Sequence, residues 1–305
     1  MVTHVAWTQW DDLEVPAGVE LLNPSSAPLD SADLGSVTFY VPPYMTGLAG
    51  LEPVTRMPKL AHLQLPNAGS DDAVPFAREG LTIHNARGVH DISTAELALA
   101  LTLASNRGFD DFHRAQAQGA WRPKRYQSLW RARVGIIGFG SIGRTIARLM
   151  EPFEAEIVPF TARGRDGTRT LAELPELLPT LDVVILILPA KPSTIGLVDA
   201  TFLSAMKDGA LLVNVARGPI VVTQDLIDEL ATGRIRAAVD VTDPEPLPDG
   251  HRLWAAPNLI ISPHVGGNSS AFEPRMRRLI YDQLKKLVDG EPLDHAVIVG
   301  REILD

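Results

Sequence analysis

The chain has 305 residues, a formal net charge of −9 and no cysteine. Its length fits two domains of ordinary size, and the lack of cysteine excludes disulfides, thiolate nucleophiles and cysteine-ligated zinc. The negative charge argues against nucleic acid or an anionic membrane as the main partner. Because the N-terminus lacks the features of a signal peptide and no apolar run approaches about 18 residues, we expect a cytoplasmic protein.

The first hundred residues predict a small α/β domain. Short apolar strands are expected near Val5 and over residues 37–41, 60–65 and 82–84, separated by stretches that are polar or helical in pattern. This alternation is typical of a domain with a parallel sheet.

An apolar helix is predicted over residues 91–106, with Ser93 or Thr94 as its N-cap. Because the helix is apolar on most sides, we expect it to be buried between the two domains.

The next segment, residues 108–133, fits neither a helical nor a strand period. It contains Trp121, Tyr126 and Trp130 among basic residues. We interpret it as an arm that could cover a partner subunit, which favours a homodimer.

A glycine-rich turn follows the strand predicted over residues 134–137. Gly138, Gly140 and Gly143 form a Gly-x-Gly-x-x-Gly pattern that leads into a helical stretch. In this setting the first glycine permits the tight turn, the second lets the backbone approach a pyrophosphate, and the third lets the helix pack close to the strand. Free amides at the helix N-terminus would face the phosphates. The pattern predicts a bound dinucleotide, and the alternative is a glycine-rich turn without a ligand.

The end of the next strand, predicted over residues 156–160, indicates which dinucleotide is bound. NAD-binding folds usually place an acidic residue there to accept from the ribose 2′-hydroxyl, but this chain has Thr161, Arg163 and Arg165. A small hydroxyl and two guanidinium groups suit a 2′-phosphate. We therefore predict NADP(H) as the preferred cofactor, with NAD(H) as the second option. The two arginines could alternatively be solvated loop charges.

Six strands alternate with helices from residue 134 onward, which predicts a doubly wound parallel sheet. The four strands that complete this set are expected at residues 182–188, 210–215, 237–241 and 259–261. A long amphipathic helix is expected from Ser269 to about Asp289, after which the chain returns to the first domain. We place the dinucleotide-binding domain at residues 101–284 and the substrate-binding domain at residues 1–100 and 285–305.

Three strand ends carry side chains suited to hydride transfer between a nicotinamide and a 2-hydroxy or 2-oxo acid. Ligands bind at the carboxyl edge of such a sheet, where Arg217, Glu245 and His264 are expected to converge. Arg217 can hold a carboxylate in a fork and polarise the adjacent carbonyl. His264 can exchange the proton of the substrate oxygen, while Glu245 fixes the imidazole tautomer and favours the imidazolium. Taken singly, each could instead be an ordinary structural or surface residue.

No metal site is predicted, because the sequence has no HExxH motif and no histidine pair at ligand spacing. The other histidines have no comparable context and are expected to be structural or exposed.

Together these motifs resemble those of the D-isomer-specific 2-hydroxyacid dehydrogenase family over nearly the whole chain. The matching segments, in family order, are Gly138–Gly143, Leu188–Ala190 with Ser193 and Thr194, Asn214–Gly218, Asp240–Pro246 and Ser262–His264. The resemblance implies two doubly wound α/β domains with parallel sheets, a Rossmann cofactor domain and a flavodoxin-like substrate domain, with the active site in the cleft between them.

The resemblance also implies roles for individual residues. Arg217, Glu245 and His264 would form the catalytic set, and Asp240 would hold the nicotinamide carboxamide. Further contacts with the cofactor are implied for Ser141, Ile142, Leu188, Pro189, Thr194, Val215, Ala216 and Gly266. In the first domain, Ala68 and Gly69 occupy the place of the family loop whose backbone amides bind the substrate carboxylate.

The chain departs from the family pattern at Thr161, where an acidic residue is usual. This departure makes it similar to the NADPH-dependent glyoxylate and hydroxypyruvate reductase branch, so we expect reduction of a small 2-oxo acid to the D-2-hydroxy acid. Two alternatives stay open. One is a dinucleotide-sensing binding protein or corepressor, and the other is a dehydrogenase for a phosphorylated hydroxy acid or an inorganic oxyanion.

Overall fold

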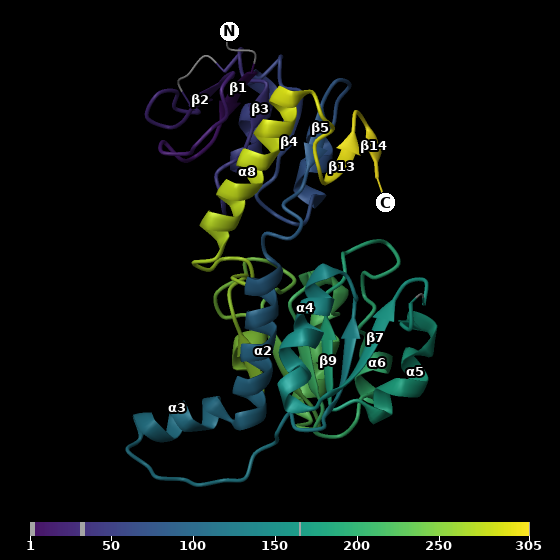
Figure 1. Ribbon diagram of the computed structural model, residues 1–305. Helices are drawn as coiled ribbons and strands as arrows, with labels where there is room; N and C mark the ends of the chain where they lie inside the picture. Colours follow the sequence, from purple (N-terminus) through teal and green to yellow (C-terminus); the bar gives the residue numbers. More distant parts are fainter. Residues whose placement is uncertain (1–3, 31–33, 165, 305) are drawn as a thin grey trace. The chain divides into compact units, whose positions relative to one another are not determined.

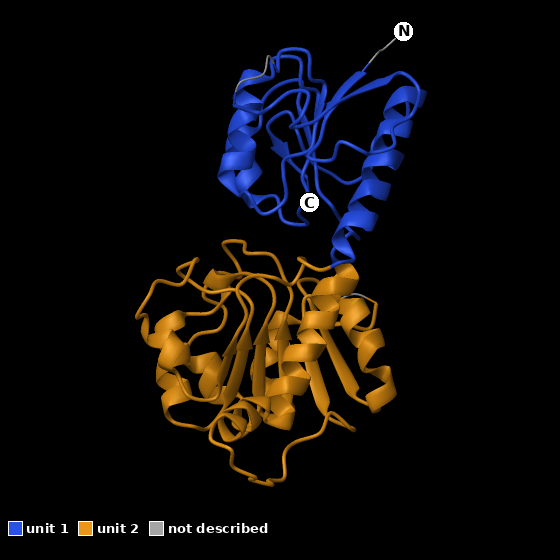
Figure 2. Cartoon of the chain, turned by 90° about the vertical axis from the view of Figure 1, so that its left-hand side faces the viewer, with its two compact units in different colours: residues 1–90, 270–305 blue, residues 91–269 orange. Residues whose placement is uncertain are grey.

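The computed structural model describes residues 4–30, 34–164 and 166–304. The chain divides into two compact units, coloured separately in Figure 2. Unit 1 contains the residues up to 90 and those from 270 onward, and unit 2 contains residues 91–269. Each unit is built on its own sheet of seven strands, which confirms the prediction of two α/β domains.

The sheet of unit 1 has the strand order β14-β13-β5-β4-β3-β1-β2. Its strands are β1 (His4–Trp7), β2 (Val19–Leu22), β3 (Phe39–Tyr40), β4 (His62–Gln64), β5 (Thr82–His84), β13 (Ala296–Val299) and β14 (Glu302–Ile303). The first five strands pair in parallel, whereas β13 runs antiparallel to both β5 and β14. The helical segments are α1 (Leu48–Leu51), η1 (Glu52–Arg56), η2 (Asp71–Phe76) and α8 (Phe272–Asp289), where η marks a 3₁₀ helix.

Helix α8 belongs to unit 1 along its whole length. Its buried residues Met276, Ile280 and Leu284 pack in one hydrophobic cluster with Ala6 and Phe39 from the sheet, and Figure 1 shows α8 alongside the strands of this unit. The predicted boundary at residue 285 would divide this helix. The structure instead places the boundary between residues 269 and 270, because a continuous apolar stripe packs on one core.

The sheet of unit 2 is parallel throughout, with the order β12-β11-β10-β9-β6-β7-β8. Its strands are β6 (Arg133–Ile137), β7 (Glu156–Thr161), β8 (Arg169–Thr170), β9 (Val183–Leu186), β10 (Leu211–Asn214), β11 (Arg236–Val239) and β12 (Leu259–Ile261). Its α-helices are α2 (Asp91–Arg107), α3 (Phe109–Ala117), α4 (Ser141–Met150), α5 (Leu174–Leu177), α6 (Ala200–Ala205) and α7 (Thr223–Ala231). Short 3₁₀ helices are η3 (Glu151–Phe153), η4 (Leu171–Glu173), η5 (Leu178–Thr180), η6 (Gly218–Ile220) and η7 (Arg252–Ala255). All six predicted strands are present.

Helix α2 packs against α4, β10 and β11, so it lies in unit 2. Its residues Ala95, Ala98 and Leu101 share a buried cluster with the strands, which is why the boundary falls at residue 91 rather than at the predicted 101. Ser93 and Thr94 lie inside the first turns of the helix and are buried. Neither is the N-cap that the sequence pattern suggested.

The arm, residues 108–133, contains a helix that the sequence pattern did not reveal. Helix α3 has no buried residue, and Phe112 meets Tyr126 edge-on with ring centroids 5.2 Å apart. Trp121 is 95% exposed. Figure 1 shows α3 and the segment after it extending away from the sheet of unit 2. In the described residues, no helix combines the length and apolar character that a membrane span requires.

A pair of histidines, the half-buried His62 and the buried His84, joins β4 and β5 in unit 1. His84 Nδ1 lies 2.8 Å from the carbonyl oxygen of Asp294 and therefore donates a proton to it. His84 Nε2 then accepts from His62 Nδ1 at 3.2 Å, an arrangement that requires the His84 ring to be neutral. Burial, with smaller contributions from the neighbouring His84 and His4, lowers the pKa of His62 to about 4.

This pair predicts acid sensitivity in unit 1. Between about pH 6.5 and pH 4 the unfolded chain binds a proton at residue 62 that the folded chain does not, so the free energy of unfolding falls as the pH drops through this window. We expect a loss of about 1–2 kcal/mol, because partial exposure of the ring reduces the effect. His62→Asn keeps a donor for His84 without titrating, so urea unfolding of this variant should depend less on pH. His113→Asn on the exposed face of α3 is the control, and an equal loss in the wild type and His62→Asn would contradict the assignment.

Candidate active site

The glycine-rich turn joins β6 to α4 in unit 2. Gly138 has a φ of +105°, and a Cβ there would lie 2.1 Å from the carbonyl oxygen of Ile187. A Cβ at Gly143 would lie 2.3 Å from the carbonyl oxygen of Gly138, whereas a Cβ at Gly140 meets nothing within 4 Å. Gly138 and Gly143 therefore permit close backbone packing, whereas Gly140 faces open space at the start of α4.

This open space fits a dinucleotide pyrophosphate. Gly140 is the N-cap of α4, and no side chain caps the helix. The first amides of the helix are thus available to phosphate oxygens. Ser141 Oγ donates to a carboxylate oxygen of Asp91 at 3.3 Å, and Ile142 packs against the buried cluster that contains α2 residues.

The loop after β7 is organised around Thr161. The Oγ1 atom of Thr161 accepts a hydrogen bond from the amide of Gly164 at 3.1 Å and lies 2.7 Å from Oγ1 of Thr168. Arg163 is exposed, and Arg165 lies outside the described residues. The Thr161 hydroxyl is therefore a structural part of this loop as well as a candidate contact for the 2′-position of the ribose.

The loop after β9 is closed by Thr194. Its hydroxyl donates to the carbonyl of Pro189 at 2.7 Å and accepts from the amide of Lys191 at 2.8 Å. Leu188 is buried, 9% exposed, and Thr194 is 7% exposed. The hydroxyl of Thr194 thus fixes the shape of this loop.

Arg217 lies just beyond the end of β10. Its carbonyl accepts a hydrogen bond from Asn214 at 3.1 Å, and its guanidinium donates to the carbonyl of Ala216 at 2.7 Å. A Cβ at the next residue, Gly218, would lie 1.9 Å from the carbonyl oxygen of Thr242. The backbones that follow β10 and β11 are therefore in direct contact. Val215 and Ala216, expected near the cofactor, are buried in the same turn.

His264 and Glu245 form a hydrogen-bonded pair. Nδ1 of His264 contacts Oε1 of Glu245 at short range, so the carboxylate accepts and Nδ1 must carry a proton. Nε2 is then the nitrogen that can exchange a proton with a ligand. The side chains of His264 and Glu245 are 48% and 37% exposed, which gives both access to solvent.

Asp240 is joined by a hydrogen bond to Gly266, which lies close to His264 in the chain. The amide of Gly266 donates to Oδ2 of Asp240 at 2.8 Å, and the Asp240 side chain is 3% exposed. Sequence reasoning gave Ser262 no individual role, although its hydroxyl donates to Oδ1 of Asp240 at 2.6 Å. Its position directly before Pro263 and His264 was the available signal.

Ala68 and Gly69 belong to unit 1, in the loop after β4. The carbonyl of Ala68 accepts a hydrogen bond from Asn85 at 2.8 Å, and the carbonyl of Asn67 accepts from the amide of Ala86 at 2.8 Å. The loop is therefore held by its carbonyl groups, while the other predicted site residues lie in unit 2.

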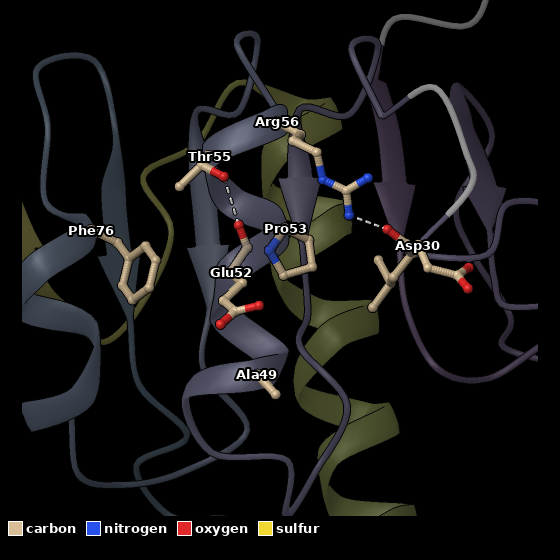
Figure 3. Close-up of a pocket in the computed structure, with 8 residues that line it drawn as sticks. Asp30, Ala49, Glu52, Pro53, Thr55, Arg56 and Phe76 are labelled. Carbon is tan, nitrogen blue, oxygen red and sulfur yellow. Dashed lines mark hydrogen bonds between the residues drawn. The ribbon is translucent and has the colours of Figure 1, made fainter.

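A cavity of about 480 Å³ also opens in unit 1 (Figure 3). Its lining consists of Leu29, Asp30, Ala49, Glu52, Pro53, Thr55, Arg56 and Phe76. Arg56 donates to the carbonyl of Leu29, and the carboxylates of Asp30 and Glu52 make the lining unfavourable for an organic acid. None of the predicted site residues lines this cavity. In the described part of the chain, no group of three acidic or histidine side chains is arranged to bind a metal ion.

Comparison with known sequences agrees with the geometry. The sequence pattern of the D-isomer specific 2-hydroxyacid dehydrogenase NAD binding domain matches residues 99–266. The chain is 33% identical to human glyoxylate reductase/hydroxypyruvate reductase over 230 residues, which cover 71% of this chain and 70% of that protein. It is 32% identical to a formate dehydrogenase from Neurospora crassa over 279 residues, 86% of this chain and 72% of that one.

Solved structures show the same fold. A D-isomer specific 2-hydroxyacid dehydrogenase family protein from Aeromonas salmonicida is 26% identical with a TM-score of 0.85, covering 96% of this chain and 98% of that one. The NADPH-dependent glyoxylate/hydroxypyruvate reductase from Sinorhizobium meliloti, in complex with NADP and sulfate, is 22% identical with a TM-score of 0.79. That match covers 96% of this chain and 97% of the other.

The glycine geometry predicts different outcomes for two similar substitutions. Gly140→Ala places a methyl group in open space, so stability should change by no more than about 1 kcal/mol, while NADPH binding should weaken at least tenfold. Gly138→Ala places a methyl group on the carbonyl of Ile187 at positive φ and should destabilise unit 2 by roughly 3 kcal/mol or more. Urea unfolding and NADPH fluorescence titration measure the two effects. Normal binding by Gly140→Ala would show that no phosphate approaches this turn.

Proposed function

Because the chain belongs to the D-isomer specific 2-hydroxyacid dehydrogenase family, we propose that it reduces a small 2-oxo acid to the D-2-hydroxy acid with NADPH. Membership of the family makes the protein an NAD(P)-dependent oxidoreductase. The observation that carries the proposal is the hydrogen bond between His264 and Glu245 in the unit that also holds the glycine-rich turn. Glyoxylate and hydroxypyruvate are the proposed substrates.

His264 is the proposed proton donor. Because Glu245 accepts the proton of Nδ1, the opposite nitrogen, Nε2, is free to give a proton to the substrate oxygen during reduction and to take it back in the reverse direction. The carboxylate of Glu245 also fixes the orientation of the ring for this transfer. When bound, the nicotinamide supplies the hydride that reduces C2 of the substrate.

Arg217 is the proposed anchor for the substrate. A guanidinium binds a carboxylate through two parallel hydrogen bonds, which fixes the orientation of the neighbouring carbonyl. The side chain of Asn214 holds this turn, because it accepts from the amide of Ala216 and donates to the carbonyl of Arg217. We further propose that the amides of Ala68 and Gly69 in unit 1 can donate hydrogen bonds to a substrate carboxylate.

The proposed cofactor contacts lie along the carboxyl edge of the sheet of unit 2. Gly140 and Ser141 would bind the pyrophosphate at the start of α4, because that helix has no side-chain cap. Thr161, Arg163 and Arg165 would bind the 2′-phosphate, since no acidic residue occupies the end of β7. The S. meliloti reductase with the same fold contains NADP, which supports this preference.

A panel of substrates tests the proposed function. The purified protein should oxidise NADPH faster than NADH when the acceptor is glyoxylate or hydroxypyruvate. The other acceptors to compare are pyruvate, phenylpyruvate and a phosphorylated 2-oxo acid. Oxidation of formate with NAD⁺ is measured separately. Tight binding of NADPH without turnover of any acid would overturn the proposal in favour of a dinucleotide-sensing protein. Faster turnover of the phosphorylated acid or of formate would assign a different substrate class.

We also propose that the protein forms a homodimer through the arm, residues 108–133. Four large apolar side chains of this segment are exposed, namely Phe109, Phe112, Trp121 and Trp130. Exposed apolar patches usually mark interaction surfaces. Three cations near Trp121, at Arg122, Lys124 and Arg125, complement the net negative charge of a second copy. Sedimentation equilibrium gives the mass in solution, and a monomer at micromolar concentration would contradict the dimer.

His264→Asn should abolish turnover without unfolding the protein. His264 has a φ of +52°, a conformation that asparagine tolerates better than most residues. We expect kcat to fall by about 10²–10⁴, with the Kd for NADPH within threefold of the wild-type value. His251→Asn is the matched control because His251 caps η7 with its side chain, and asparagine can do the same. Turnover near the wild-type rate in His264→Asn would exclude the proposed proton donor.

Thr161→Asp should reverse the cofactor preference. Aspartate can still accept the hydrogen bond from Gly164 but repels a 2′-phosphate, so the ratio of kcat/KM for NADPH to that for NADH should fall about tenfold or more. Thr201→Asp, on the exposed first turn of α6, adds the same charge elsewhere and should leave the ratio unchanged. An unchanged ratio in Thr161→Asp would place recognition of the phosphate at another residue.

A further inference from the structure

One buried carboxylate holds the loop that carries His264. Oδ1 of Asp240 accepts hydrogen bonds from the hydroxyl of Ser262 at 2.6 Å and from the amide of Val265 at 2.9 Å. Oδ2 accepts from the amide of Gly266 at 2.8 Å. The three donors lie on both sides of His264 in the sequence, so this single side chain spans the loop.

The backbone of Asp240 adds a fourth hydrogen bond. Its carbonyl oxygen accepts from the amide of His264 at 2.7 Å. His264 itself has a φ of +52°, which costs a residue with a Cβ roughly 1–2 kcal/mol. Such a conformation persists only where the surroundings impose it. Here the conformation is imposed by the end of β11 and by the side chain of Asp240, the residue that follows this strand.

Gly266 lies directly on the carboxylate. A Cβ at this position would be 3.0 Å from Oδ2 of Asp240, 3.5 Å from Cγ2 of Thr94 and 3.7 Å from Cδ2 of Leu97. The loop is therefore pressed between Asp240 and helix α2. A Cβ at position 266 would therefore require the carboxylate of Asp240 to shift by a few tenths of an ångström from the amide it accepts from.

The hydrogen-bond capacity of Asp240 is almost fully used. A carboxylate has about four acceptor positions, and three are taken by Ser262, Val265 and Gly266. The side chain is 3% exposed, and in the described part of the chain no lysine or arginine forms an ion pair with it. These three donors approach both oxygens of the carboxylate and hold it in place.

We propose that Asp240 is a positioning residue for His264, acting through the loop from Ser262 to Gly266 rather than chiefly through the nicotinamide. The carboxylate fixes the loop so that Nδ1 of His264 meets Glu245 and Nε2 is presented to the substrate. Ser262, Val265 and Gly266 are the parts of the loop that it holds. The inference rests on the proposed function only where it refers to turnover.

Asp240→Asn tests the proposal because it replaces one acceptor oxygen by an NH₂ group that faces N–H or O–H donors. We expect kcat to fall about 10–100-fold, since a small misplacement of a reacting group has effects of this size. The Kd for NADPH should stay within threefold of the wild-type value. Amide hydrogen exchange should accelerate for residues 262–267 and not in the rest of unit 2. Asp249→Asn, at an exposed position in the loop after β11, is the matched control.

Ser262 provides a milder test with a conservative rescue. Ser262→Ala removes one of the three donors and should reduce kcat several-fold with the KM for NADPH unchanged. Ser262→Thr keeps the hydroxyl and should restore most of the loss. A merely structural effect on the fold would lower the melting temperature of both variants without separating their kcat values.

Two results would overturn the positioning role. One is an Asp240→Asn protein that binds NADPH at least tenfold more weakly and shows wild-type exchange in residues 262–267, because it would make the carboxylate a cofactor contact. The other is identical turnover in the wild type, Ser262→Ala and Asp240→Asn. If the wild type reduces no 2-oxo acid, the proposed function fails, whereas the exchange and NADPH-binding measurements still test whether Asp240 holds the loop.

Discussion

Direct contact between backbones at the carboxyl edge of the sheet is the constraint on which the candidate site depends. At Gly138 and Gly218 a Cβ would lie 2.1 Å and 1.9 Å from a carbonyl oxygen of a neighbouring turn. No side chain fits between these turns, so the turns after β6, β9, β10 and β11 are held at fixed separations. Side chains that follow the strands, Arg217 among them, are consequently brought to one edge by the backbone itself. Precision of this kind is what a site for an oriented reaction requires.

Two carboxylates divide the task of placing one imidazole. Glu245 contacts the ring and decides which nitrogen carries the proton, whereas Asp240 contacts the chain on both sides of the ring. The exposure of the two acids reflects this difference, since the Glu245 side chain is 37% exposed and Asp240 is 3% exposed. An acid that must respond to the changing charge of a histidine remains near solvent. An acid that holds a loop is most effective where water cannot compete for its donors.

Local sequence patterns predicted the elements whose neighbours are close in the chain. The strand, glycine turn and helix around Gly138 form one continuous unit, and the apolar run of α2 defines a helix without further information. Patterns did not reveal β8, two residues long, or β2, whose strand is defined by pairing with β1. Helix α3 has no buried residue, so its sequence lacks the regular spacing of apolar residues that predicts a helix. The domain boundaries and the donors around Asp240 depend on contacts between distant residues, which no local pattern contains. Arg217, Glu245 and His264 could be selected because their positions after strands follow from the strand pattern alone.

The two crossings of the chain between the units, at residues 90 and 270, have a consequence for synthesis on the ribosome. Unit 2 is a continuous segment and can complete its core as soon as it has emerged. Unit 1 cannot, because α8 and β13 follow unit 2 in the chain and cover the sheet face that contains Ala6 and Phe39 and the edge of β5. The first ninety residues therefore keep an unpaired strand edge and an exposed apolar face until α8 and β13 have been synthesised. Segments in that condition are prone to aggregate, so the order of synthesis exposes the N-terminal part of unit 1 to this hazard for longer than unit 2.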